Sequence, residues 1–319
     1  MNALPKGIYP TMITPFTDDD RVDYDLLEPL LRWYEERDCT GVFAVCQSSE
    51  MFCLSLDETL TITRKLMQLR RPETVMLASG HTSLEISEMV STAQAIIAEG
   101  VDCYVFIANR FAAQNEDDDV LLHRVEQVTK HLGDFPLGFY ECPAPVYNRL
   151  LTPYVIERLP SLGNFVFLKD TCCDMTQLRA KLAAAQGTSL QIYNANSAML
   201  LESLQAGCAG YSGVMGNFHP RLYAKLCACW QQQPELAARI AAVLGVTSAI
   251  EKLAYPINAK YHMQLQGIPM SLHKRTPRVD AVDFDENARY VTRQMLQLTD
   301  ALEGDIFCSF FEKKEPKKL

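Results

Sequence analysis

Short apolar runs alternate with amphipathic segments along the first two thirds of the chain, and this pattern constrains the fold most. Eight apolar runs occupy residues 8–14, 41–46, 74–79, 103–107, 136–140, 165–169, 190–193 and 210–214. The segments between them repeat apolar residues at helical spacing. Several of these segments end at a glycine, such as Gly100 and Gly207, which suits the end of a helix. Strand–helix alternation repeated eight times predicts an α/β fold, a (β/α)8 TIM barrel.

The pattern changes after the eighth run, because residues 220–302 are helical throughout in their periodicity. Pro256 and the turn Gly267-Ile268-Pro269 divide this part into pieces. We therefore expect a catalytic barrel domain over residues 1–225 and a helical C-terminal extension over 226–302. The charged end of residues 303–319 predicts a mobile, solvated tail.

Composition narrows the class of partner. The chain has 319 residues and a formal net charge of −9, and it lacks a basic cluster in its body, which argues against nucleic acid. No apolar run approaches the roughly 20 residues that span a bilayer, so we expect no membrane association. Eleven cysteines, scattered through apolar segments, predict reduced thiols in the cytoplasm. The spacing of cysteines and histidines predicts no metal site, and no glycine-rich phosphate motif suggests a cofactor.

A lysine at the end of the sixth apolar run is the first candidate for chemistry. The run Phe-Val-Phe-Leu over residues 165–168 reads as a buried parallel strand and leads into Lys169. An ammonium group loses hydration there, and burial lowers its pKa. A neutral amine can attack a keto group and form a Schiff base. The structural alternative is a lysine that extends toward solvent and pairs with Asp170.

Two further strand ends carry candidate groups, because active residues of such barrels lie where strands end. Tyr140 ends the fifth run and could move protons for a nearby lysine, or it could be a packed aromatic residue with a satisfied hydroxyl. Gln47, Ser48 and Ser49 follow the second run. Small hydroxyl residues in such a loop can hold a substrate carboxylate, or they can cap the next helix.

The order of these features resembles the dihydrodipicolinate synthase / N-acetylneuraminate lyase family over nearly the whole chain to about residue 300. The resemblance rests on residues 7–16, the loop 46–50, the motif Tyr-Glu-Cys-Pro at 140–143, the strand 166–171, Tyr255-Pro256 and Gly267-Ile268-Pro269. It implies a barrel with a helical C-terminal region, usually a homotetramer, and class I aldolase chemistry. Lys169 would form a Schiff base with pyruvate or a related 2-keto acid, and Tyr140 would act as acid and base. Ser48 and Ser49 would bind the carboxylate, and Thr171 would contact substrate.

The chain departs from the family pattern around the substrate. Cys46 and Ser49 replace loop glycines, and Gln47 replaces the first hydroxyl residue of that loop. Phe111 stands where the synthase branch has the tyrosine that it lends to a neighbouring subunit, and Arg110 precedes it. Pro145 occupies the position of the synthase arginine for the second carboxylate, with Arg149 nearest in sequence. Glu141 replaces an asparagine. We expect Thr171, Glu141 and Arg110 to face the variable substrate.

These observations predict a class I aldolase/lyase or condensing synthase that needs no cofactor, because the iminium ion itself accepts the electrons. Its partners would be a small 2-keto acid and an aldehyde or sugar-acid partner, and the protein would be a homo-oligomer, a tetramer or a dimer. Dihydrodipicolinate synthase proper is a second hypothesis. A non-catalytic barrel that binds a keto acid or sugar acid is the third.

Overall fold

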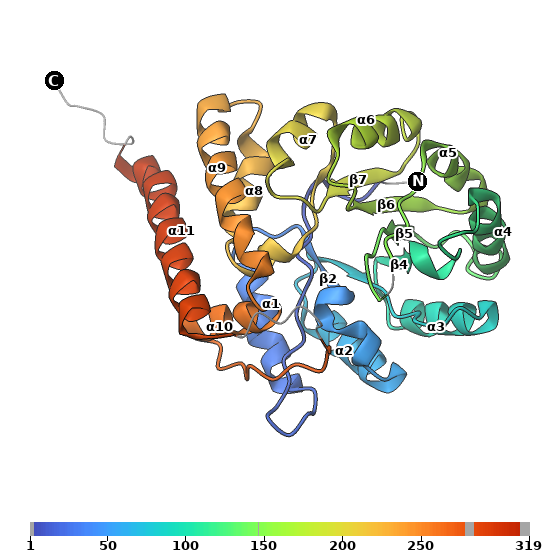
Figure 1. Ribbon diagram of the computed structural model, residues 1–319, viewed down its shortest axis with the longest axis horizontal. Coiled ribbons are helices and arrows are strands. Elements are labelled where there is room, and N and C mark those ends of the chain that lie inside the picture. Colours follow the sequence, from blue (N-terminus) through green and yellow to red (C-terminus); the bar gives the residue numbers. More distant parts are fainter. Residues whose placement is uncertain (1–2, 146, 278–283, 313–319) are drawn as a thin grey trace.

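The computed structural model describes residues 3–145, 147–277 and 284–312, with side chains to residue 307. Eight parallel strands form one sheet in the order β1-β8-β7-β6-β5-β4-β3-β2. The strands are β1 Gly7–Ile8, β2 Gly41–Val45, β3 Val75–Ala78, β4 Cys103–Ile107, β5 Leu137–Tyr140, β6 Phe165–Asp170, β7 Gln191–Asn194 and β8 Gly210–Tyr211. Helices surround them (Figure 1), so the predicted (β/α)8 barrel is confirmed.

The barrel closes between its first and second strands. β1 is regular only over Gly7–Ile8, shorter than the predicted run of residues 8–14. The chain beyond it still runs along β2, because Phe43 N–H donates to Pro10 O and Met12 N–H donates to Phe43 O. An isolated parallel bridge joins Thr11 to Phe43. Prolines 10 and 15 lack an N–H donor, which explains why this segment pairs without forming a longer regular strand.

The helices follow the predicted alternation, with their ends set by local capping. They are α1 Leu27–Glu35, α2 Leu56–Leu69, α3 Ile86–Ala98, α4 Asp118–Thr129, α5 Pro153–Leu162, α6 Met175–Ala184, α7 Leu200–Ala206, α8 Pro220–Cys229, α9 Pro234–Thr247, α10 Ile257–Leu265 and α11 Glu286–Glu312. Ser55 and Glu58 form a capping box at α2, and Asp174 caps α6. Gly207 ends α7 at a φ of 116°, a value that glycine adopts without strain.

The C-terminal extension consists of α9, α10 and α11 and packs beside the barrel, next to α8 (Figure 1). Trp33 of α1 donates a hydrogen bond to Gln266 at the end of α10. α11 runs from Glu286 to Glu312, so residues 303–312 continue a helix where the sequence suggested the start of a tail. The remaining predicted tail, residues 313–319, lies outside the described residues. None of the described helices is long and apolar enough to cross a bilayer.

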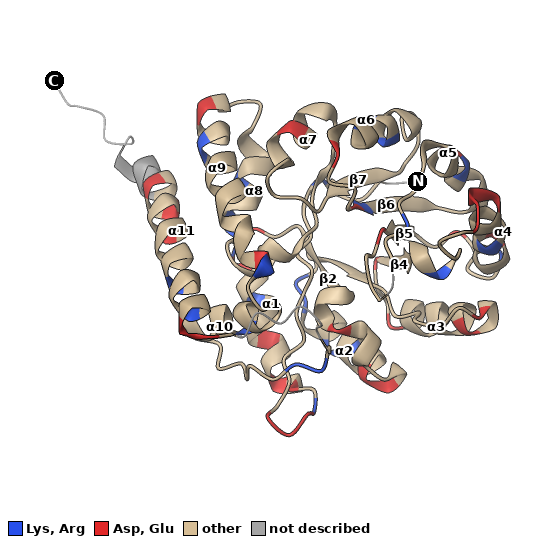
Figure 2. Cartoon of the chain, in the orientation of Figure 1, with Lys and Arg blue, Asp and Glu red and all other residues tan. Residues whose placement is uncertain are grey.

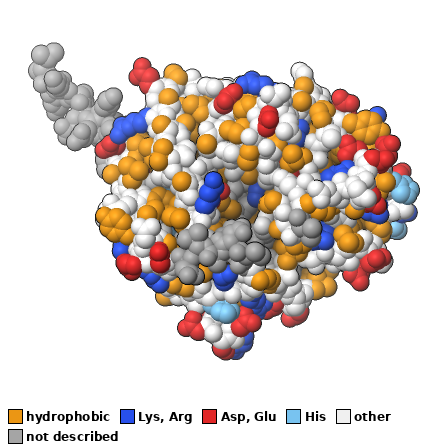
Figure 3. Space-filling model, viewed as in Figure 1, with side chains coloured by type: hydrophobic (Ala, Val, Ile, Leu, Met, Phe, Trp, Pro, Cys, Tyr) orange, Lys and Arg blue, Asp and Glu red, His pale blue; other side chains and the backbone are white. Residues whose placement is uncertain are grey.

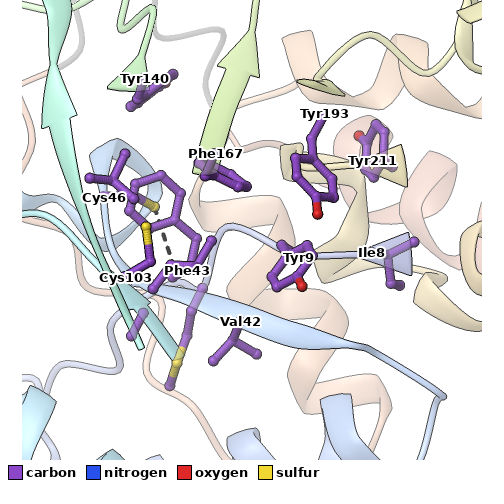
Figure 4. Packing of buried hydrophobic residues seen from close by; sticks show 14 of the residues in the cluster. Ile8, Tyr9, Val42, Phe43, Cys46, Cys103, Tyr140, Phe167, Tyr193 and Tyr211 are labelled. Carbon is purple, nitrogen blue, oxygen red and sulfur yellow. Dashed lines mark hydrogen bonds between the residues drawn. The ribbon is translucent and has the colours of Figure 1, made fainter. Parts of the chain in front are cut away.

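Aromatic side chains fill the barrel below the strand ends (Figure 4). The Phe167 ring stacks on Tyr193 at 4.9 Å between centroids, and Tyr9 packs edge-on against Tyr193 at 5.0 Å. Phe43 lies 6.0 Å from the ring of Tyr140. These rings are buried and packed against one another, so any polar group above them is desolvated on its lower side.

Charged side chains lie mainly on the helices and loops, and the strands carry very few (Figure 2). Lys169 and Asp170 are the only charged residues within the eight described strands, and both belong to β6. On the face shown in Figure 3, acidic, basic and apolar side chains are interspersed. β6 is therefore the strand that carries two opposite charges into a largely apolar barrel.

Candidate active site

A cavity of about 720 Å³ opens at the C-terminal ends of the strands, where barrels of this kind hold their active sites. Five of the predicted site residues line it: Gln47, Ser48, Tyr140, Lys169 and Thr171. They come from the ends of β2, β5 and β6, which are far apart in sequence. The other three predicted residues, Ser49, Glu141 and Arg110, do not line this cavity.

Lys169 reaches into the cavity from β6, where it is 3% exposed and pairs in register with Tyr140 of β5. Its Nζ atom lies 4.0 Å from the centroid of the Tyr140 ring. Within the described part of the chain, Nζ has no carboxylate at ion-pair distance, and Asp170 pairs with Lys181 instead. The alternative of a Lys169–Asp170 pair is therefore wrong, because successive residues of a strand point to opposite faces.

Burial lowers the pKa of Lys169 from the usual 10.5, since desolvation disfavours its ammonium form. Weaker interactions with Cys46, Cys142 and Glu251 oppose this change. The net effect enlarges the neutral fraction of the amine near neutral pH. A neutral, buried amine beside an open cavity has the chemistry of a carbonyl nucleophile.

Tyr140 extends over Lys169, and its hydroxyl donates a hydrogen bond of 2.9 Å to Oε1 of Gln47. The Cys142 thiol lies 3.5 Å from the same amide oxygen. Burial raises the pKa of Tyr140 well above 10, so the phenol is protonated at neutral pH. Its hydroxyl is satisfied, as the structural alternative expected, yet its oxygen can still accept a hydrogen bond from a group in the cavity.

The loop after β2 holds its two serines differently. The Ser48 hydroxyl donates to Oγ1 of Thr11 at 2.9 Å, and Ser48 lines the cavity. The Ser49 hydroxyl lies 2.8 Å from the carbonyl oxygens of both Met12 and Ala44 and accepts a hydrogen bond from Cys46 N–H. Ser49 is thus a structural residue of the loop. Its hydroxyl does not line the cavity, so the predicted contact with a substrate carboxylate is wrong.

The replaced glycines do not strain this loop. Cys46 has a φ of −157°, which is extended backbone open to any residue. The left-handed conformation falls on Glu50, with a φ of 59°. The Glu50 carboxylate accepts a hydrogen bond from Lys260 Nζ at 3.0 Å and from the backbone N–H groups of Arg275 and Thr276, at 2.7 Å each. The C-terminal region therefore anchors the loop that carries Gln47 and Ser48.

Glu141 points away from the cavity into a buried cluster of charges. Lys181 of α6 donates to Glu141 Oε1 at 2.5 Å and to Asp170 Oδ2 at 2.6 Å. Glu141 also accepts hydrogen bonds from the N–H groups of Leu151 and Thr171. Burial raises the pKa of Glu141, while the two carboxylates raise the pKa of Lys181 against its own burial. The expectation that Glu141 faces the substrate is therefore wrong, because a charge at the turn after β5 is neutralised from α6.

Thr171 and Arg110 differ in position. The Thr171 hydroxyl lies in the cavity wall, donates to Glu141 O at 2.7 Å and accepts from Asn148 Nδ2 at 3.1 Å. Arg110 follows β4, and its guanidinium lies 5.3 Å from the ring of Phe52. Its Nε is buried without a hydrogen-bond partner among the described residues. Arg110 therefore packs against Phe52 and does not line the cavity.

The predicted departures at Phe111 and Arg149 can also be placed. Phe111 is fully buried within its own chain and packs against Phe106 at 5.1 Å. Arg149 donates to Asp118 Oδ1 at 2.8 Å and to the Glu116 carbonyl at 2.7 Å. Neither residue lines the cavity. The site therefore has no arginine of its own in the described cavity wall.

Glu251, Lys252 and Tyr255 line the cavity from the C-terminal extension, and the repeated strand–helix pattern does not predict this. They lie in and after the 3-10 segment η6 Ser248–Lys252, which joins α9 to α10. The motif Tyr255-Pro256 was the one signal in the sequence that pointed here. Among the described residues, no group of three or more His, Cys, Asp or Glu side chains is arranged to hold a metal ion.

Comparison with known proteins identifies the family of this chain. The model of the dihydrodipicolinate synthetase family matches residues 4–296. The chain belongs to this family. The family resemblance inferred from the motifs is thereby confirmed, and so is the prediction of an enzyme, since members of this family are lyases or synthases of the aldolase type.

Relatives and solved structures span almost the whole chain. A 4-hydroxy-tetrahydrodipicolinate synthase of Cyanothece is 25% identical over 293 residues, covering 91% of this chain and 97% of that protein. An uncharacterized DapA-like lyase of Pyrococcus abyssi is 24% identical, covering 88% and 94%. YagE, a prophage protein of Escherichia coli K12 solved in complex with pyruvate, has a TM-score of 0.81 at 23% identity, covering 94% and 99%. At this identity the structural likeness establishes the fold.

Proposed function

We propose that this protein is a class I aldolase/lyase or condensing synthase in which Lys169 forms a Schiff base with pyruvate or a related 2-keto acid. The observation that carries the proposal is the position of Lys169: buried, without an ion pair in the described chain, and open to the cavity. Its lowered pKa supplies the neutral amine that attacks a carbonyl. The complex of the family member YagE with pyruvate supports the choice of keto acid.

The reaction would begin when the Lys169 amine attacks the keto carbon and forms a carbinolamine. Tyr140 would donate a proton to the departing hydroxyl, so that water leaves and an iminium ion remains. The hydrogen bond from Tyr140 to Gln47 would hold the phenol over Nζ before this step, and it would break when the phenol gives its proton to the departing hydroxyl. Breaking or making the adjacent carbon–carbon bond would then pass through the enamine, with the iminium as electron acceptor.

The substrate carboxylate would lie by Ser48 and Gln47, which line the cavity on the side of β2. Thr171 would contact the substrate across the cavity, with its hydroxyl fixed by Glu141 O and Asn148. The second partner would be an aldehyde or a sugar-acid fragment. The ten free cysteines among the described side chains support a reducing, cytoplasmic setting. A homo-oligomer, tetramer or dimer, remains part of the proposal.

The direct test is reductive trapping. The protein is incubated with pyruvate, reduced with borohydride and examined by mass spectrometry. We expect a mass increase equal to pyruvic acid minus one oxygen atom, located on Lys169. Lys169→Ala should lose it, and the exposed-lysine control Lys130→Ala should keep it. No adduct in the wild type, or an adduct that survives Lys169→Ala, would refute the assignment.

Dihydrodipicolinate synthase proper is the second candidate, favoured by relatives named 4-hydroxy-tetrahydrodipicolinate synthase. A coupled assay with pyruvate and aspartate semialdehyde tests it. We expect low activity, because Phe111 has no hydroxyl and Arg149 is bound to Asp118. Activity comparable to that with the best other aldehyde would favour this candidate. Stabilisation by a keto acid without adduct or turnover would favour the non-catalytic binding barrel.

A further inference from the structure

Glu251 presents a carboxyl group to the cavity that the mechanism above does not use. It lies on η6 Ser248–Lys252, is half-buried, and lines the cavity with Lys169 and Thr171. In the described part of the chain no hydrogen bond or ion pair holds this carboxyl group. It interacts electrostatically with Lys169 and Lys252. An acidic group left without a hydrogen-bond partner in a cavity wall is available to a ligand.

The other acidic group of the cavity wall is not available in this way. Glu50 also lines the cavity, but its carboxylate is bound by Lys260 and by two backbone N–H groups. The Lys169 amine would be used in the Schiff base, and Lys252 is exposed to solvent, so neither lysine occupies the Glu251 carboxyl group. Glu251 is then the carboxyl group that a second substrate meets.

The cavity offers few cations to an anionic partner. Arg149 is bound to Asp118, and Arg110 packs against Phe52, so neither reaches the described cavity wall. Besides Lys252, which interacts with Glu251, the wall carries neutral polar groups, including Asn148 and Asn196. Amide groups and a carboxylate form hydrogen bonds with hydroxyl groups, while a carboxylate repels a second anion.

We propose that Glu251 determines which second substrate the enzyme accepts: it hydrogen-bonds a hydroxyl group of a neutral, hydroxylated aldehyde and disfavours aldehydes that carry a negative charge. This inference rests on the proposed Schiff-base function. In condensation, Glu251 would contact the incoming aldehyde. In cleavage, it would contact the part of the substrate that leaves as the aldehyde.

The discrimination should depend on pH. Burial raises the pKa of Glu251 to about 7, with Lys169 and Lys252 opposing. Tyr211 and Tyr223 interact electrostatically with the same group and are protonated, because burial raises the pKa of both. Glu251 therefore gains its charge as the pH rises through about 7. Preference for a neutral over an anionic aldehyde should increase between pH 6 and pH 8.

The test compares two aldehydes that differ at one end. Glyceraldehyde ends in a CH2OH group and tartronate semialdehyde ends in a carboxylate. Condensation of each with pyruvate is measured as kcat/KM for the wild type, Glu251→Gln, Glu251→Asp and the surface control Glu202→Gln. We expect the wild type to prefer glyceraldehyde. Glu251→Gln should reduce that preference by about tenfold, while Glu251→Asp and Glu202→Gln keep it.

Reductive trapping of pyruvate in the same preparations separates the two proposals. No adduct in the wild type would overturn both. An adduct in Glu251→Gln together with the reduced preference supports the role of Glu251. If Glu251→Gln traps pyruvate but discriminates as the wild type does, the role in specificity is overturned and the Schiff-base function stands. Loss of the adduct in Glu251→Gln would show that Glu251 acts on the reactivity of Lys169, and this would overturn its role in specificity. A wild type that favours tartronate semialdehyde would also overturn the inference.

Discussion

Replacing Lys181 by methionine should destabilise the protein severely, because it would leave two buried carboxylates without their cation. Glu141 is 0% exposed and Asp170 is 1% exposed. Lys181 Nζ lies 2.5 Å and 2.6 Å from them. Glu141 would keep two backbone N–H donors, and Asp170 would keep one from Cys172. Removing one member of a buried ion pair costs about 3–5 kcal/mol, and we expect Lys181→Met to fall in that range.

Urea denaturation of Lys181→Met beside Lys130→Met provides the measurement. Lys130 is exposed at the end of α4, so its replacement should change the free energy of unfolding by less than about 0.5 kcal/mol.

The pKa of Glu141 is raised in the folded protein to about 7, and loss of Lys181 removes an interaction that lowers it. The folded variant therefore binds a proton more tightly than the unfolded chain does. The stability of the variant should recover as the pH falls through the Glu141 pKa, which without Lys181 lies above about 7. A Lys181→Met protein as stable as Lys130→Met, or one that weakens further on acidification relative to wild type, would refute this account.

Three further changes test the site. Tyr140→Phe should lower kcat by about 10²–10⁴-fold in steady-state assays, because it removes the proton donor. Pyruvate trapping after long incubation should persist, as checked by mass spectrometry. Ser49→Ala should lower the free energy of unfolding by about 1–3 kcal/mol, since the hydroxyl near the Met12 and Ala44 carbonyls is buried, and an unchanged urea midpoint would contradict it. The rate of adduct formation should rise with pH with a midpoint below 10.5, because burial lowers the pKa of Lys169; a midpoint at 10.5 or above would show an ordinary lysine.

The sequence predicted the barrel well, because strands buried on both faces have apolar sequences without interruption. β4 matches the predicted residues 103–107, and the other strands differ mostly by a residue or two at their ends. β8 is regular only over Gly210–Tyr211 of the predicted residues 210–214, and the largest difference is in β1. Its apolar run of residues 8–14 contains Pro10, whose missing N–H limits regular pairing, and apolar composition alone does not show this.

The site was predictable where the strand period alone decides the direction of a side chain. Lys169 and Tyr140 end adjacent strands, and both line the cavity. The predictions for Glu141 and Ser49 were wrong, because loop conformation and partners distant in sequence determine where these two side chains point. Lys181 lies in the last turn of α6, and nothing in the local sequence indicates that it neutralises Glu141. Glu251 was missed because it enters the cavity from outside the repeated strand–helix pattern.

The two lysines associated with β6 show how one strand can carry opposite requirements. Lys169 points into the barrel, where no carboxylate in the described chain pairs with it, and burial lowers its pKa. Asp170, the next residue, points outward to Lys181, whose pKa is raised by two carboxylates. Because Lys181 also binds Glu141, it joins the ends of β5 and β6 on the outer side.

This outer pair stands directly behind the inner pair. Glu141 follows Tyr140, and Asp170 follows Lys169, so the buried ion cluster fixes the backbone that presents both catalytic candidates. A stability loss in Lys181→Met should therefore be accompanied by a fall in kcat even at low temperature, where the variant remains folded. Glu141→Gln keeps the shape of the cluster and removes one charge, and it should lower kcat less than Lys181→Met. If both variants unfold early but turn over at the wild-type rate, the cluster stabilises the barrel without positioning Tyr140 and Lys169.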